Sequence, residues 1–183
     1  MTGKKKSETE LQTDAKQQLE YRTVTCLEWK PVLEDDRMKD IIIDSMSFLC
    51  KHNWARIYAF VIMQNHLHMI WKILGEYELQ NVQRNFLKFT GQQILKILRN
   101  ENSPMYDEVV VNAKDRKRQV WERNSLGIPL WSKWIISQKL DYIHNNPVRA
   151  GLCEYGYEYE YSSARFYQFG DRRWEFLTRL EGL

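Results

Sequence analysis

Two apolar runs constrain the fold of this 183-residue chain more than any other feature. Residues 54–63 (WARIYAFVIM) and 67–73 (LHMIWKI) are rich in β-branched and aromatic residues, and only Gln64-Asn65-His66 lies between them. Two such runs joined by a tight turn predict a hairpin of two buried strands. The longer run is about half the length of a membrane span, so the sequence predicts a core hairpin and not a membrane anchor.

Helical patterns lie on both sides of this hairpin. Apolar residues recur every three or four positions over residues 34–52 and 78–100, which predicts two amphipathic helices. A further helix is predicted over 133–145, ending before Pro147 because proline disrupts a helix. The remaining strands are predicted at 21–29 and within 119–131. The order β, α, β, β, α, β, α predicts an α+β fold of the ferredoxin-like kind, an antiparallel sheet with helices packed on one face.

The two ends of the chain are expected to lie outside the folded domain. Residues 1–20 are polar with charges that cancel, which predicts a flexible arm. Residues 21–169 are predicted to form the domain, and 170–183 a C-terminal tail. No apolar stretch follows the basic N-terminus, so we expect no signal peptide. Three cysteines without CxxC spacing predict reduced thiols, as in a cytoplasmic protein.

A pair of histidines follows the predicted turn. In Asn65-His66-Leu67-His68 the two imidazoles share one face of a strand, because alternate side chains point the same way. Two imidazoles on one face form half of a metal site. They are equally typical of a hydrogen-bonded pair within a sheet, and the spacing alone does not decide between these interpretations.

A tyrosine lies in the last predicted helix, in residues 141–147 (DYIHNNP). Tyr142 and Asn146 are four residues apart and share a helix face, whereas His144 is expected at the surface or behind the site. Free tyrosine is a poor nucleophile because its pKa is about 10, but a phenolate beside a metal-bound phosphate is reactive. A tyrosine that only packs at a helix end is the alternative.

Together, the histidine pair and the tyrosine helix resemble the single-tyrosine HUH transposases, and among them the REP-associated tyrosine transposases. The resemblance covers about residues 20–169. It is carried by IMQNHLHMIW (62–71), QKLDYIHNNPVRAGL (138–152) and YSSARFY (161–167). The sequence departs from the family at Gln64, where many relatives have proline, and this departure concerns the turn.

The resemblance implies roles for the matching residues. His66 and His68 correspond to the pair that binds a divalent cation, Mg²⁺ or Mn²⁺, and Asn146 falls at the position of a third ligand. Tyr142 corresponds to the nucleophile that becomes joined to a DNA 5′-phosphate. The implied function is a DNA strand transferase that cleaves and rejoins single-stranded or hairpin-flanking DNA. Some relatives dimerise, so a homodimer stays open.

Basic residues are concentrated where DNA contacts are needed. Residues 84–123 contain nine Lys and Arg against five Asp and Glu, a net charge of +4 compared with +3 for the whole chain. A basic helix face beside a basic loop predicts contacts to DNA phosphates, and a merely solvated face is the alternative. The predicted DNA-binding residues are Arg84, Lys88, Lys96, Arg99, Arg116, Lys117 and Arg118.

Two other classes of function stay open. One is a domesticated relative that binds DNA hairpins without cleaving them, although His66, His68 and Tyr142 are all present. The other is a zinc hydrolase that uses His66, His68 and His144. Such an enzyme needs a carboxylate to activate water, and the sequence contains no HExxH-like pattern.

Overall fold

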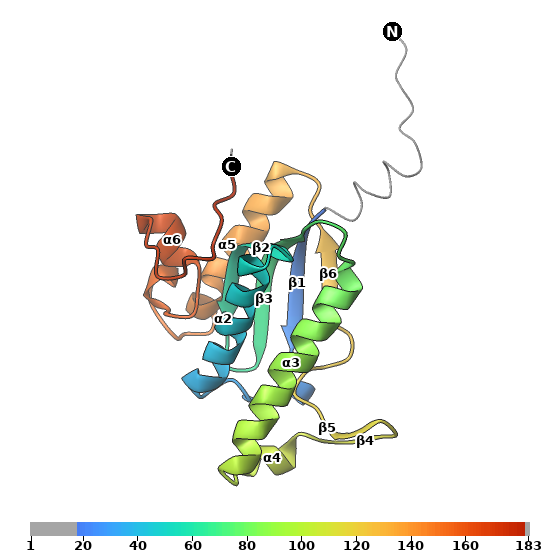
Figure 1. Ribbon diagram of the computed structural model, residues 1–183. Helices are drawn as coiled ribbons and strands as arrows, with labels where there is room; N and C mark the ends of the chain where they lie inside the picture. The colour runs from blue at the N-terminus through green and yellow to red at the C-terminus, as the bar shows by residue number, and fades with distance from the viewer. Residues whose placement is uncertain (1–17, 182–183) are drawn as a thin grey trace.

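The computed structural model describes residues 18–181, so residues 1–17 of the expected arm lie outside the described part of the chain. Four strands form an antiparallel sheet in the order β2-β3-β1-β6 (Figure 1). They are β1 (Leu19–Thr25), β2 (Ala55–Ile62), β3 (His66–Ile73) and β6 (Leu126–Pro129). Leu19 and Glu20, which were expected in the arm, therefore belong to the first strand. The ferredoxin-like α+β class is confirmed.

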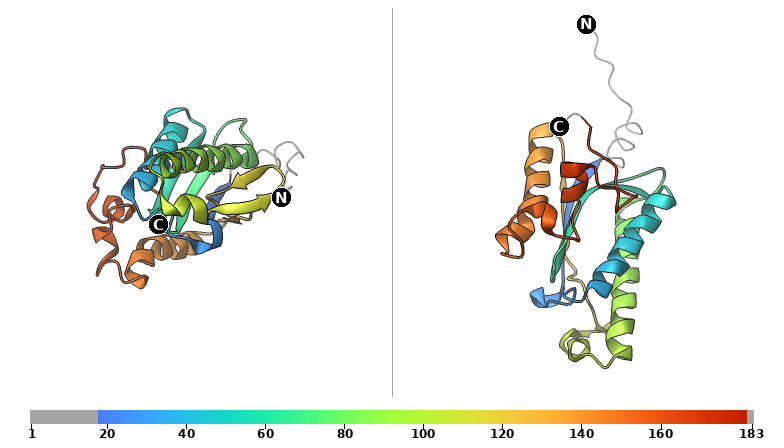
Figure 2. Two further views of the ribbon diagram at one scale, coloured as in Figure 1. Left: turned by 90° about the horizontal axis from the view of Figure 1, so that it is seen from below. Right: turned by 90° about the vertical axis from the view of Figure 1, so that its left-hand side faces the viewer.

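Helices cover both faces of the sheet (Figure 2). The helices α2 (Asp36–Lys51) and α3 (Leu79–Asn100) lie on one face, as predicted. The prediction that the helices share one face is wrong for α5 (Lys133–Arg149), which packs against β2 and β3 from the other side. A sheet covered on both faces needs apolar residues on both, which explains the continuous apolar runs of β2 and β3.

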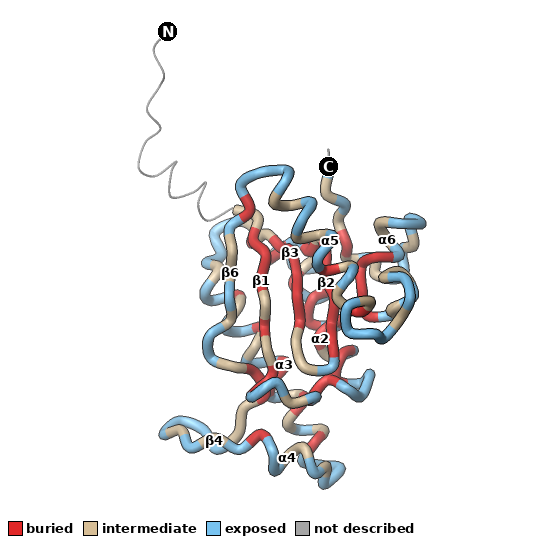
Figure 3. Tube along the Cα trace, turned by 180° about the vertical axis from the view of Figure 1, so that it is seen from behind, coloured by how far each residue is buried: buried red, intermediate tan, exposed pale blue. Residues whose placement is uncertain are grey.

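Alternation along the strands divides the core into two parts. Val24, Leu67 and Trp71 pack under α2 and α3 in the larger cluster. Tyr21, Ala59, Val61 and Ile70 face the other way and pack against Ile143 of α5 in the smaller one. Strands β1, β2 and β3 are accordingly buried along much of their length (Figure 3). His66 and His68 belong to the face under α5, because they have the same strand parity as Ile70.

Helix α5 extends beyond the predicted end. Its N-terminus is capped by Ser132, whose side chain accepts a hydrogen bond from the Ile135 amide. The expectation that the helix ends before Pro147 is wrong, since Pro147 lies inside it and is buried. A proline in the last turn removes a single hydrogen bond, and its ring gains burial. Asn146 therefore keeps its helical position four residues after Tyr142.

Short elements complete the chain. The region expected to be irregular, residues 101–119, contains a short helix and a β-hairpin. The remaining elements are η1 (Leu27–Trp29), α4 (Pro104–Glu108), β4 (Val110–Ala113), β5 (Arg116–Arg118), η2 (Gly156–Glu158) and α6 (Ala164–Phe169). Between residues 18 and 181, no helix has both the length and the apolar character needed to cross a bilayer.

C-terminal segments cover the outer edge of β2. The Ile62 amide donates to the Tyr161 carbonyl at 2.9 Å, and the Thr178 amide donates to the Ile57 carbonyl at 2.9 Å. Phe60 also contacts the rings of Trp174 and Phe176. The first part of the expected tail is therefore packed against the sheet.

Candidate active site

His68 is held by hydroxyl groups of the neighbouring strand. The register of β1 against β3 places Thr23 opposite His68. His68 Nδ1 lies 2.8 Å from the Tyr21 hydroxyl and 2.9 Å from the Thr23 hydroxyl. Burial lowers the pKa of His68 to about 3, and the charges of His66 and Lys139 act in the same direction. The imidazole is therefore neutral at physiological pH, the form that binds metals.

His66 lies between two asparagines. Its Nδ1 is 2.7 Å from Asn65 Oδ1 and its Nε2 is 3.3 Å from Asn146 Oδ1. An amide oxygen only accepts hydrogen bonds, and a neutral imidazole has one N–H to donate. If that proton is on Nδ1, at the shorter of the two contacts, the Nε2 lone pair is free. Burial lowers the pKa of His66, and the contact with Asn146 partly opposes this effect. The His66 ring lies 4.7 Å from that of His68, centroid to centroid.

This donor set fits a divalent cation. In the tautomer with the proton on Nδ1, His66 Nε2 and Asn146 Oδ1 are two electron-pair donors 3.3 Å apart, which one cation could bind together. If His68 donates Nδ1–H to a hydroxyl of β1, its Nε2 is likewise free, which is the usual arrangement around metal-binding histidines. The described residues contain no group of three His, Cys, Asp or Glu side chains that could hold a metal. A third protein ligand at this site would have to be a group of another kind, such as the nearby Asn146 Oδ1.

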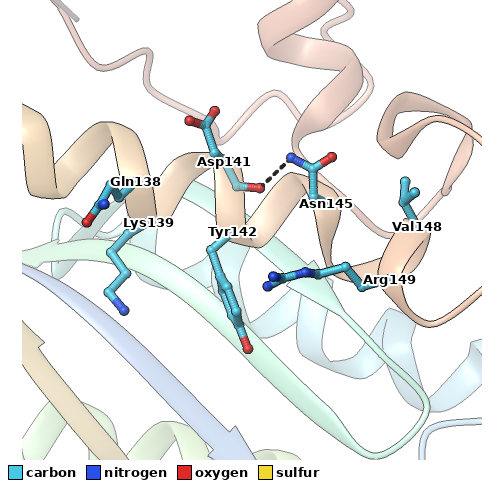
Figure 4. Close-up of a pocket in the computed structure, with 7 residues that line it drawn as sticks. All are labelled: Gln138, Lys139, Asp141, Tyr142, Asn145, Val148 and Arg149. Carbon is cyan, nitrogen blue, oxygen red and sulfur yellow. Dashed lines mark hydrogen bonds between the residues drawn. The ribbon is translucent and has the colours of Figure 1, made fainter.

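Tyr142 lies beside the histidine pair. Its ring packs edge-to-face against His68, with centroids 5.2 Å apart, and it remains 37% exposed. Lys139 and Arg149 flank the ring at 5.7 Å and 5.6 Å from its centroid. The Arg149 side chain reaches back along α5 towards the tyrosine (Figure 4). Tyr142, Lys139 and Arg149 line an open pocket of about 590 Å³ together with Asp141. Its two cationic side chains outnumber the one carboxylate and can attract a phosphate towards the tyrosine.

A basic groove of about 810 Å³ runs between α3 and the segment from β5 to residue 123. Its cationic lining residues are Arg84, Lys88, Arg116, Arg118 and Arg123, and we call this feature the basic groove. Three predicted DNA-binding residues, Lys96, Arg99 and Lys117, do not line it. Arg118 also pairs with Asp107 and lies over the Tyr106 ring.

His144 does not join the histidine pair. It is half-buried, and its Nε2 lies 2.9 Å from the Ser163 hydroxyl. Burial lowers its pKa to about 4. Because its ring points at Ser163, the three-histidine zinc site considered from the sequence is not formed, and His144 connects α5 to the segment before α6.

Several residues of the site were missed in the sequence. Lys139 and Arg149 lie three residues before and seven after Tyr142, so helical spacing alone could have found them. Tyr21 and Thr23 also share a strand face, but their contact with His68 depends on a strand register that no local pattern gives. Asn65 was visible only as a turn residue.

The fold places a histidine pair on β3, an inner strand of a ferredoxin-like sheet, with the helix that carries Tyr142 packed over it. The solved structure of a REP-associated tyrosine transposase bound to a REP hairpin is similar, with a TM-score of 0.62 and 14% identity. The match covers 100% of this chain and 95% of that one. The resemblance expected from the motifs is thus confirmed at the level of the fold.

Other comparisons add little to this match. A candidate transposase from Deinococcus radiodurans has a TM-score of 0.45 and 17% identity, over 70% of this chain and 90% of that chain. No family model matches the sequence, and no curated protein matches it.

Proposed function

We propose that this protein cleaves and rejoins DNA strands through a covalent link between Tyr142 and a DNA 5′-phosphate. The observation that carries the proposal is the packing of Tyr142 against His68, beside the contact between His66 Nε2 and Asn146 Oδ1. Because the Tyr142 ring contacts the His68 ring, the phenol oxygen and a cation bound by the histidines could act on the same phosphate. The substrate is single-stranded or hairpin-flanking DNA. The similar structure is that of a protein bound to a REP hairpin, which supports this choice.

The reaction exchanges one phosphate ester for another. The phenol oxygen of Tyr142 attacks the phosphorus, and the bond from phosphorus to the 3′ oxygen breaks. The proton lost by the phenol is balanced by the proton that the leaving 3′ oxygen takes up. The products are a free 3′-hydroxyl and a 5′-phosphotyrosine. Because the number of ester bonds is unchanged, another 3′-hydroxyl can reverse the step and join a new strand without a nucleotide cofactor.

The side chains around Tyr142 have distinct tasks. Lys139 and Arg149 hold the phosphate and offset the charge that develops on it. His66, His68 and Asn146 would hold Mg²⁺ or Mn²⁺, which when bound supplies positive charge to the phosphate oxygens. Tyr21 and Thr23 keep the His68 ring in position. The basic groove provides sequence-independent contacts to the DNA backbone further along the strand.

Covalent capture tests the proposal. The protein is incubated with labelled random-sequence single-stranded DNA and Mn²⁺, and DNA that stays attached after denaturation is detected and sequenced. Tyr142→Phe keeps the ring and its packing, so it should bind DNA normally and form no adduct. The matched control is Tyr77→Phe at another exposed tyrosine, which should form the adduct normally. An adduct with Tyr142→Phe would refute the assignment, and DNA binding without any wild-type adduct would indicate a protein that binds DNA without cleaving it.

A further inference from the structure

Trp29 is an exposed indole next to the histidine pair. Its side chain is 59% exposed, and its ring meets that of His66 edge-to-face with centroids 5.5 Å apart. The rings of Trp29, His66, His68 and Tyr142 therefore form a row of successive neighbours. A large apolar surface left open beside a site is typical of a ligand contact.

The backbone at Trp29 has a conformation that bulky residues rarely adopt. Glu28 and Trp29 have φ values of 51° and 58°, both in the left-handed region that favours glycine. Strained positions of this kind persist only where surrounding contacts hold them, and they cluster at functional sites. Trp29 is thus both exposed and strained, so neither burial nor backbone preference accounts for an indole here.

Hydrogen bonds fix the segment that carries Trp29. Glu122 Oε1 accepts from the Glu28 amide at 2.8 Å, and the Trp29 amide donates to the Cys26 carbonyl at 3.0 Å. Asn65 Nδ2 donates to the Trp29 carbonyl at 3.2 Å. The same Asn65 side chain accepts from His66 Nδ1. One side-chain amide therefore joins the backbone of Trp29 to the ring of His66.

The same segment connects the histidine pair to the basic groove. The Leu27 amide donates to the Val120 carbonyl at 2.7 Å, and the Glu122 amide donates to the Thr25 carbonyl at 2.8 Å. Val120 and Glu122 line the groove. The segment that carries Trp29 thus contacts both the lining of the basic groove and, through the Trp29 ring, the histidine pair.

We infer that Trp29 stacks on a base of the DNA strand, next to the phosphate that Tyr142 attacks. This inference rests on the proposed function and names the contact that positions the strand. Every base has a flat π-face, so stacking on an indole holds single-stranded DNA without selecting a sequence. The stacked base fixes the distance between the adjacent phosphate and the phenol oxygen.

Two DNA probes separate stacking from backbone binding. One is fluorescein-labelled oligo(dT) and the other is an abasic strand of equal length, and fluorescence anisotropy is measured in EDTA so that no cleavage occurs. Trp29→Gly suits the left-handed backbone and removes the ring. It should weaken oligo(dT) binding roughly 5- to 150-fold, the range for loss of one stacked base, and leave abasic binding unchanged. Trp29→Phe keeps an aromatic face and should retain most of the affinity.

Trp131→Ala is the matched control, because Trp131 is 76% exposed and lies near the start of β1, at the opposite end of that strand from Trp29. It should change neither affinity. Equal weakening of both probes by Trp29→Gly, or the same base-specific loss in Trp131→Ala, would overturn the inference. If the wild type forms the covalent adduct but Trp29→Gly binds oligo(dT) as tightly as the wild type, only the stacking inference is refuted. If Trp29→Gly loses oligo(dT) affinity but the wild type forms no adduct, only the covalent function is refuted. If the wild type binds neither probe, both are refuted.

Discussion

Gly156→Ala should displace the helix that carries Tyr142. A Cβ atom at position 156 would lie 2.1 Å from the His144 carbonyl oxygen and 3.0 Å from its carbon. Ordinary contact begins at 3.4 Å, so η2 and α5 must separate by about 1.3 Å, the difference between 3.4 Å and 2.1 Å. Both sides of this contact belong to the main chain, so no side-chain rotation can relieve it.

Two effects of this displacement can be measured. Overpacking of this kind costs about 1–3 kcal/mol of unfolding free energy, which urea denaturation detects. Because His144 lies between Tyr142 and Asn146 in sequence, the shift also moves the nucleophile. A misplacement of about 1 Å can slow a reaction by about 100-fold, so the rate of covalent DNA capture should fall towards that extent.

Gly170→Ala separates the two effects. Gly170 has a φ of 70° and nothing within 4 Å of the added Cβ, so alanine there costs about 1 kcal/mol through the backbone alone. This variant should be less stable and still form the adduct at the wild-type rate. A Gly156→Ala protein with wild-type stability and wild-type capture rate would refute the argument.

Three further perturbations follow from the site. Unfolded histidine binds a proton near pH 6.5 but buried His144 only near pH 4, so acid favours the unfolded chain. Between pH 7 and pH 5 the unfolding free energy of the wild type should fall by about 2 kcal/mol more than that of His144→Gln. Denaturant melts in which the difference between the two proteins does not change with pH would contradict this. His68→Ala should abolish Mn²⁺ binding in isothermal titration, and normal binding would disprove the cation site. The Arg84→Gln and Lys88→Gln double variant should reduce the slope of log DNA affinity against log salt by up to about 0.7 per lost contact, whereas Lys96→Gln outside the groove should not.

Local patterns were sufficient for the long elements and for placing the two histidines on one strand face, whereas the roles of the site residues came from the family resemblance. The apolar runs predicted β2 and β3, the helical spacing predicted both ends of α3 to within a residue, and strand parity paired His66 with His68. These features depend on residues close together in the sequence.

Features that depend on distant segments could not be predicted in this way. Helical periodicity identifies the apolar side of α5 but does not specify which face of the sheet it covers. The contacts of Tyr21 with His68 require the register between β1 and β3. Pro147 was expected to end α5, and tertiary burial outweighed its local preference. The left-handed backbone at Trp29 depends on hydrogen bonds from residues far along the chain.

Coverage of the β2 edge limits how copies of this protein could assemble. An open edge strand is a template on which another chain can add a strand, but segments near residues 161 and 178 already use the backbone groups of β2. Sheet extension between two copies is therefore left to β6, a strand of four residues that ends in Pro129. Proline has no amide hydrogen to donate there. Backbone pairing at the edges of the four-stranded sheet could therefore contribute little to a homodimer of the described residues, and side-chain surfaces would have to supply most of its interface.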